Sequence, residues 1–261
     1  MKKLSLGRHA FGLAAIGFGA ISFVSHDFCA PWQQIQALGN VPHREILVYI
    51  AATVELCGGI AIQWRKTARF GAVALGSIFL TFALLWIPRV IGEPRVYDRY
   101  GNVFEQLSLV AGALIVYGAF SARNSASAAK ILRVGYVLFG ICVVSFTLEQ
   151  LFYLRATASF VPKWIPPGQM FWSIATTIFF GLAAIALLSG RFSLLASRLV
   201  LAMILGFQFL IWLPAPFADP HQLMNWAGNA ENLAIAGAAW IVAEYLGRSA
   251  TAPEAALRQA A

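Results

Sequence analysis

The sequence predicts an all-α, polytopic membrane protein whose eight transmembrane helices form two fused four-helix bundles. Three observations lead to this prediction: the composition, the lengths of the apolar stretches, and features that occur twice in the chain. Of the 261 residues, 59% are hydrophobic and only 11% are charged. Because a soluble domain carries roughly 25% charged residues, this chain has too little charge to cover a surface in water. Lipid is the solvent that suits this composition.

The apolar stretches have the length that a bilayer requires, about 20 residues for a helix. They are continuously apolar, whereas the strands of a membrane β-barrel alternate between apolar and polar residues. Glycines within them, as in "GLAAIGFGA" and "AIAGAA", allow helix backbones to approach closely. The eight stretches are 10–28, 46–63, 69–91, 103–120, 132–153, 169–189, 194–215 and 228–246.

The net charge of +8 is distributed by loop, with 13 basic residues on the side of the N-terminus and 6 on the other. The first group is Lys2, Lys3, Arg8, Arg65, Lys66, Arg69, Arg123, Lys130, Arg133, Arg191, Arg198, Arg248 and Arg258, and the second is Arg44, Arg89, Arg95, Arg99, Arg155 and Lys163. Because basic loops stay in the cytoplasm, we expect a multi-pass protein of the inner membrane with both termini cytoplasmic. Lipid, and no nucleic acid, is the expected partner of this charge.

One pattern occurs twice. Residues 84–102 read "LLWIPRVIGEPRVYDRYGN", and residues 209–229 read "FLIWLPAPFADPHQLMNWAGN". Each contains Trp-(Ile/Leu)-Pro, an acidic residue before a second proline, and a final Gly-Asn. The two triplets, Trp86–Pro88 and Trp212–Pro214, begin 126 residues apart (86 and 212). We expect Trp at the membrane interface, Pro to stop or kink the helix, and Gly-Asn to cap the next helix.

The repeat predicts a tandem duplication of a four-helix unit. The first unit comprises residues 1–120 and the second 131–247. Residues 121–130, "SARNSASAAK", form the expected cytoplasmic linker, and 248–261 a disordered C-terminal tail. Four spans per unit give the two copies parallel topology, related by an axis along the membrane normal.

Ionisable residues inside predicted spans are costly in lipid and are therefore candidates for a site. Glu55, near the middle of the second stretch, is the strongest candidate. The others end or begin spans on the extracytoplasmic side, with Trp86 and Trp212 beside them: His26, Asp27, Arg89, Glu105, Glu149 and Glu231. The upstream alignment of "ISFVSHDF" with "VSFTLEQL" makes Glu149 the equivalent of His26.

Each candidate also has a structural interpretation. Glu105 and Glu231 follow Gly-Asn, so in a first helical turn they would stabilise the helix dipole. Arg89 can reach lipid phosphates or pair with Glu93, and His26 and Asp27 can form a solvated helix end. Glu55 can be a hydrogen-bonded core residue.

The sequence contains no signature of a metal, haem or flavin site. Cys29, Cys57 and Cys142 lie far apart, so no pair of neighbouring thiols supports disulfide exchange. No helix carries paired histidines that would ligate haem. With no activated nucleophile and no phosphate-binding loop, whether the protein is an enzyme is left open.

These features resemble the DoxX-like family of bacterial integral membrane proteins. The resemblance lies in the four-helix unit, in the entries "NVPHREIL" and "WIPPGQMF", in the Gly-rich acidic helix "VELCGGIAI", and in the Gly-Asn pairs. Each half covers one such unit. Some relatives belong to quinone-linked sulfur-oxidising complexes, so the resemblance implies a quinone link. The second half departs from the pattern, because apolar "TIFFGLAA" replaces the region of Glu55.

Three functions fit the sequence. The first is a redox- or quinone-associated component, in which an outer-leaflet cavity beside Glu55 and His26 holds a lipophilic ligand and exchanges protons with it. The second is a small-molecule transporter that uses Glu55, although no span has an obvious break at the midplane. The third is a non-catalytic scaffold or assembly subunit. A membrane redox partner or a second copy of the chain is the expected protein partner.

Overall fold

The computed structural model describes residues 6–29, 33, 41–121 and 126–260, and these contain helices and no strand. Six helical segments are long and apolar enough to cross a membrane. They are α1 (Leu6–Ser25), α3 (Ala68–Gly92), α4 (Asp98–Ala119), α5 (Ala126–Phe152), α7 (Gln169–Ser189) and the continuous segment Ser193–Ala218. The last comprises α8 (Ser193–Phe207), the π-helix η2 (Gln208–Trp212) and α9 (Ala215–Ala218). The all-helical class and the suitability for lipid are therefore confirmed.

Two further helices occupy the remaining predicted stretches. They are α2 (Arg44–Ala61) and α10 (Leu223–Ala260), and neither belongs to the six apolar candidates. The count of eight spans therefore stays a prediction. A short helix that the sequence did not predict, α6 (Leu154–Phe160), follows α5 directly.

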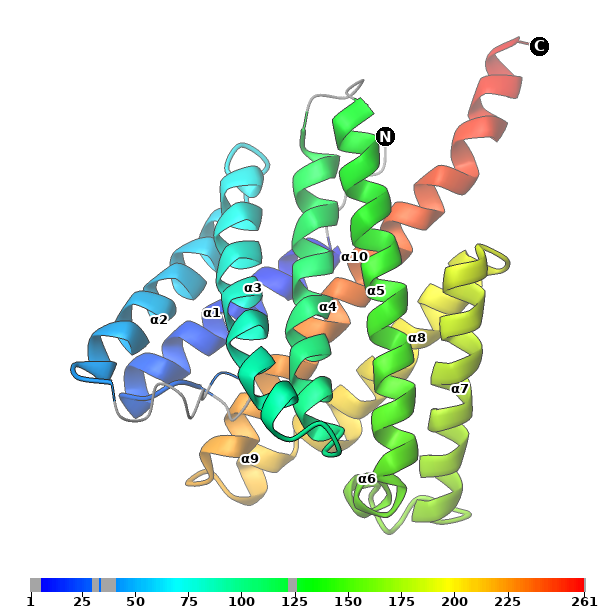
Figure 1. Cartoon of the computed structure of the whole chain (residues 1–261). Helices are drawn as coiled ribbons and strands as arrows, with labels where there is room; N and C mark the ends of the chain where they lie inside the picture. Colours follow the sequence, from blue (N-terminus) through cyan, green and yellow to red (C-terminus); the bar gives the residue numbers. More distant parts are fainter. Residues whose placement is uncertain (1–5, 30–32, 34–40, 122–125, 261) are drawn as a thin grey trace.

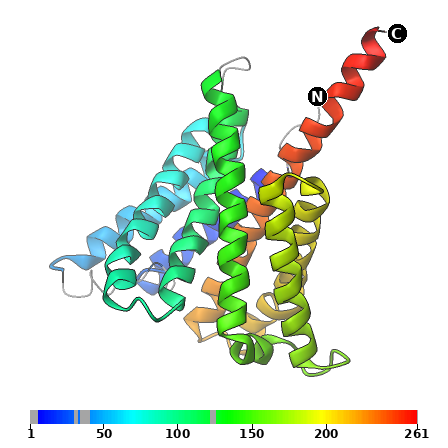
Figure 2. The same cartoon turned by 45° about the vertical axis from the view of Figure 1, so that its right-hand side comes forward.

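Helices α4 and α10 lie against each other at the centre of the molecule (Figures 1 and 2). On one side of this pair, α1, α2 and α3 follow one another in contact from α10 round to α4. On the other side, α5, α7 and α8 follow one another from α4 back to α10. We call the α1–α3 side the first half and the α5–α8 side the second half.

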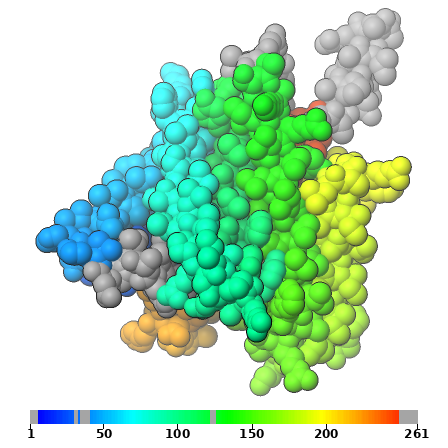
Figure 3. Space-filling view, viewed as in Figure 1, coloured from blue at the N-terminus to red at the C-terminus, as the bar shows by residue number. Residues whose placement is uncertain are grey.

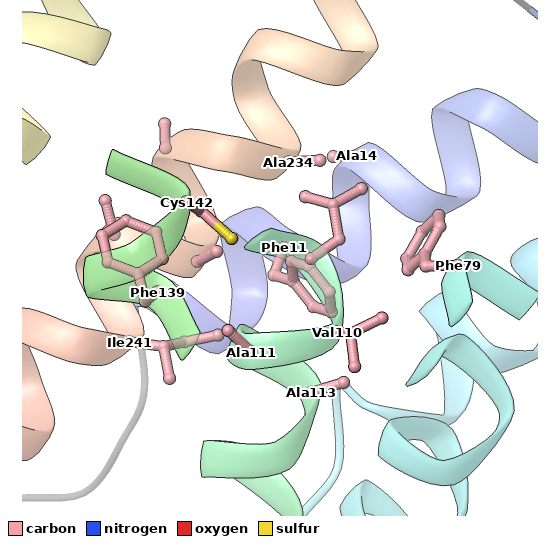
Figure 4. Packing of buried hydrophobic residues seen from close by; sticks show 14 of the residues in the cluster. Phe11, Ala14, Phe79, Val110, Ala111, Ala113, Phe139, Cys142, Ala234 and Ile241 are labelled. Carbon is pink, nitrogen blue, oxygen red and sulfur yellow. The ribbon is translucent and has the colours of Figure 1, made fainter. Parts of the chain in front are cut away.

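Small residues bring the central helices close together. A Cβ atom at Gly237 of α10 would lie 2.6 Å from the backbone N of Phe11 in α1. A Cβ at Gly112 of α4 would lie 3.0 Å from the Ala238 Cβ in α10. Figure 4 shows the core at this junction, where Phe11 lies between Phe79 on one side and Ala111 and Ile241 on the other. Because lipid provides little hydrophobic drive between helices, such close packing stabilises the bundle by dispersion.

The outer faces are apolar, as expected for contact with lipid. Helices α2, α3, α5 and α7 contribute to the face shown in Figure 3. Phe70 on α3 is 75% exposed and Ile185 on α7 is 67% exposed. Exposed apolar area on this scale marks an interaction surface, and lipid is the surface that fits it.

The expected helix stop fails at Pro88 but not at Pro214, which follows the end of η2, and the expected Gly-Asn caps are wrong. Pro88 lies inside α3, which continues to Gly92, because a proline near a helix end removes only one backbone bond. The Gly-Asn pairs do not cap helices. Helix α4 begins before the first pair, and Asn102 Nδ2 donates to Asp98 O one turn back. Asn229 lies within α10 and donates to Trp212 O at 3.0 Å.

The backbone of the predicted linker and tail contains helix, and the domain boundaries stay predictions. Helix α5 begins at Ala126, so part of the predicted linker 121–130 is helical, and 122–125 lie outside the described residues. The backbone of α10 remains helical through Ala260, where the sequence predicts a disordered tail from 248.

Candidate functional site

A cavity of about 650 Å³ lies in the second half. Its walls come from α4, α5, α6, α7, α8, η2 and α10. Most of the lining is apolar, with seven aromatic side chains that include Phe160, Trp172 and Trp212. Phe160 and Trp212 lie with ring centroids 6.0 Å apart. A small molecule with a large apolar part would fill such a space.

Three carboxyl groups line the cavity, from Asp98 and Glu105 on α4 and Glu149 on α5. Asp98 Oδ2 is 2.8 Å from the Arg99 Nη1, so it has an ion-pair partner. Glu149 packs directly over Gly101, where any Cβ would overlap its carboxyl group. Glycine at 101 therefore makes the room that the Glu149 side chain occupies.

Glu231 lies behind this wall on α10, and its carboxyl group lies beside that of Glu105. Only 6% of Glu231 is exposed, and its Oε1 has no partner among the described atoms. The central helix pair thus places two neighbouring carboxyl groups beside the cavity.

Amides and hydroxyls fix the rest of the polar lining. The Oε1 of Gln150 accepts hydrogen bonds from the hydroxyls of Thr176 and Thr177, each at 3.1 Å. Asn232 Nδ2 donates to Ile204 O at 3.1 Å and to Gln208 Oε1 at 2.8 Å. The π-helix η2 begins at Gln208, and π-helical turns are frequent at functional sites.

Glu55, the strongest candidate from the sequence, lies in the first half and does not line the cavity. It is fully buried, and Gln33 Nε2 donates to its Oε1 at 2.8 Å. Phe28 and Cys29 are buried in the same half. The Glu55 Oε2 has no partner among the described atoms. The carboxyl group is thus enclosed by the chain itself.

His26 and Asp27 form a partnered helix end near the surface. His26 Nδ1 is 2.8 Å from the Tyr49 hydroxyl, and Asp27 Oδ1 is 2.6 Å from Arg44 Nη2. These contacts join the end of α1 to the start of α2. They agree with the structural interpretation of both residues and leave them outside the cavity lining.

Arg89 pairs with Glu93, with Nη1 and Oε1 3.1 Å apart. Arg99 also binds Glu93, with Nε and Oε2 2.9 Å apart. The hydrogen bond from Arg99 is the main cause that lowers the pKa of Glu93, which lies beyond the end of α3. Trp86 is buried in α3 with 7% exposure. Neither Arg89 nor Trp86 lines the cavity.

Of the predicted site residues, Glu105, Glu149 and Trp212 line the cavity, and Glu231 lies directly behind it. The first-turn interpretation of Glu105 and Glu231 fails, because α4 begins at Asp98 and α10 at Leu223. Sequence reasoning missed Gln150, Tyr153 and Asn232. A spacing signal existed for Tyr153, which lies four residues after Glu149 and therefore on the same helix face.

Comparison with known proteins identifies no relative of this chain. No family model, curated protein or solved structure matches the chain. Among the described residues, no group of three or more His, Cys, Asp or Glu side chains is arranged to hold a metal ion.

Proposed function

We propose that the protein is a multi-pass inner-membrane protein that binds a lipophilic small molecule in the cavity of the second half. The cavity itself carries this proposal. Its volume of about 650 Å³ is within the range of small-molecule sites, about 300–1,000 Å³. Its aromatic walls suit an apolar body, and its carboxyl groups suit a polar end. A redox- or quinone-associated role of DoxX-like type belongs to this proposal, with a quinol hydroxyl donating to a carboxylate.

We also propose eight spans in two duplicated units with cytoplasmic termini. Gly7 of α1 packs on Ile241 of α10, and Gly135 of α5 packs on Ile115 of α4. The isoleucines are 126 residues apart (115 and 241) and the glycines 128 (7 and 135). The same kind of crossing in both halves supports an ancestral unit. In this register the counterpart of Glu149 is Ile21 rather than His26.

Both ends of the described chain support the proposed orientation. The backbone N of Leu6 donates to Glu244 Oε1 at 3.2 Å, so α1 starts beside the later part of α10. An even number of crossings returns the chain to its starting side. The basic residues concentrated on that side favour the cytoplasm.

The test of ligand binding uses two alanine variants that differ only in position. Ala156 on α6 lines the cavity, whereas Ala202 on α8 does not, and both are exposed. We expect purified wild type and Ala202→Trp to bind a decyl-substituted benzoquinone or a lipophilic cation in titration calorimetry. Ala156→Trp should bind at least about tenfold more weakly, because the indole occupies cavity volume. Equal binding by all three, or none by wild type, would reject the proposal.

Transport is the second candidate, and the break in the segment Ser193–Ala218 favours it. The π-helix η2 interrupts this segment beside the cavity, whereas the sequence suggested no break. Broken helices accompany transporter binding sites. Proton-driven uptake of a ligand that the purified protein binds, measured in proteoliposomes, would distinguish transport from binding alone.

A further inference from the structure

The charged groups that line the cavity are all of one sign. They are Asp98, Glu105 and Glu149, and no Lys, Arg or His is among the lining residues. This bias does not come from the composition, because the chain has 19 Lys and Arg against 11 Asp and Glu. With carboxyl groups as its only charged side chains, the lining disfavours anions.

One of these carboxyl groups has no partner of its own. Asp98 is paired with Arg99, and Glu105 contacts Glu231. For Glu149, no hydrogen bond or ion pair occurs among the side chains that the structure describes. A carboxylate away from water is stable only with a counter-charge or hydrogen-bond donors. An ionised Glu149 carboxylate would therefore be stabilised by a positive or donating group of a ligand.

Two of the N–H donors that line the cavity are already engaged. Trp172 Nε1 donates to Pro166 O at 2.9 Å, and Asn232 Nδ2 donates to two acceptors. A ligand whose polar end only accepts, such as a carboxylate or a quinone carbonyl, finds these donors occupied. A ligand that carries positive charge meets an unpaired carboxyl group instead.

The aromatic walls favour the same class of ligand. Phe146 and Tyr153 belong to the lining beside Glu149, and the lining also includes Trp172 and Trp212. A cation over an aromatic face gains about 0.5–2 kcal/mol, and desolvated sites are at the upper end. Aromatic rings can therefore surround a positive group while Glu149 neutralises it.

From these observations we propose that the cavity binds a lipophilic cation, an apolar molecule with a protonated amine or a fixed positive charge, held by Glu149. This inference rests on the proposed function and names the class of its ligand. It predicts that charge, rather than size, decides which apolar molecule binds.

The test uses tetraphenylphosphonium and tetraphenylborate, which have the same shape and opposite charge, together with a neutral decyl-substituted benzoquinone. Binding to the full-length protein in a neutral detergent is measured by calorimetry. We expect the cation to bind at least about tenfold more tightly than the anion. Glu149→Gln should remove most of this preference. Glu45→Gln should retain it, because Glu45 is exposed on α2 and outside the cavity.

Each outcome decides one question. Tetraphenylborate binding as tightly as tetraphenylphosphonium, or an unchanged preference in Glu149→Gln, overturns the cation proposal. Binding of the neutral quinone alone overturns it too, while the proposed cavity function stands. If none of the three probes binds, the proposed function itself fails. Melting temperatures of both variants, matched to wild type, show that the change lies in the site and not in the fold.

Discussion

The two halves treat their buried carboxyl groups differently. In the first half, Glu55 is enclosed, and Gln33 from the connection between α1 and α2 donates to it. Phe28, from the same connection, packs against Phe82 of α3 with centroids 6.0 Å apart. In the second half, the connection after α5 forms α6, which is one wall of the cavity. Glu149 lines this cavity.

In each half, the segment that follows the first long helix decides whether a buried carboxyl group is open to a ligand. The framework of long helices does not decide it. Both halves use glycine at the crossing with the central pair, at Gly7 and at Gly135. The chain closes one interior with its own side chains and leaves space in the other. If the proposed duplication holds, a binding site can arise in one half while the other half becomes structural.

The largest expected effect concerns the shared framework. A Cβ at Gly7 would lie 2.6 Å from Ile241 N, and one at Gly135 2.8 Å from Ile115 Cγ1. Gly7→Leu and Gly135→Leu should each destabilise the protein by about 3 kcal/mol or more, because both overpack a crossing. Gly206→Leu is the matched control, since nothing lies within 4 Å of its Cβ position. Unfolding in denaturant measures the free energy of unfolding of the three variants. A loss confined to one half would break the equivalence of the two crossings.

The second effect concerns the closed interior. Gln33→Ala removes the donor to Glu55 and leaves a fully buried carboxyl group unpartnered, which should cost about 1–3 kcal/mol of stability. Gln150→Ala, in the second half, should cost less because its amide borders the open cavity. The midpoints of thermal unfolding compare the two variants. An equal loss of stability in both variants would show that the interiors of the two halves are equally enclosed.

A third prediction separates the halves by binding. Glu55→Gln should leave the affinity for tetraphenylphosphonium within about twofold of wild type, because Glu55 is enclosed in the other half. A tenfold loss, equivalent to about 1.4 kcal/mol, would place Glu55 in the ligand site. Calorimetric titration of the same preparation that tests Glu149→Gln provides the measurement.

The smallest effect concerns Glu93 and Asp219, the acidic residues that precede the second proline in the two repeated turns. Because the hydrogen bond from Arg99 lowers the pKa of Glu93, the group stabilises the fold above its unfolded pKa, about 4.3. That contribution is lost as pH falls through the lower folded pKa. Glu93→Gln should slightly flatten the stability curve in this acidic range. Asp219→Asn is the matched change in the second half, where the side chain accepts only a backbone N–H. Identical curves for Glu93→Gln and wild type would contradict the prediction.

The sequence predicted the long helices well and their ends poorly. The stretch 69–91 corresponds to α3 and 169–189 to α7, since continuous apolar runs of this length have one stable form in lipid. The start of α4 was misplaced because its helix begins at Asp98, whose backbone N donates to the Tyr153 hydroxyl at 3.2 Å. That partner lies 55 residues away in the chain, and no local pattern reveals it.

The site was predictable in part for the same reason. Polar residues within apolar helices identified Glu105, Glu149 and Glu231, because lipid makes such residues conspicuous. The same rule ranked Glu55 first, although Gln33 donates to one of its carboxyl oxygens and the chain encloses it. Periodicity does not reveal which connection fills a space and which leaves it open. The cavity depends on the placement of α6, which side-chain packing far from its own sequence decides.

The most direct measurement is a crystal structure of the full-length protein grown from lipid with tetraphenylphosphonium present. The account predicts non-protein density between Glu149 and Trp212 in the second half, and protein side chains alone around Glu55 in the first. Density beside Glu55, or an α6 that folds inward and fills the space beside Glu149, would contradict it.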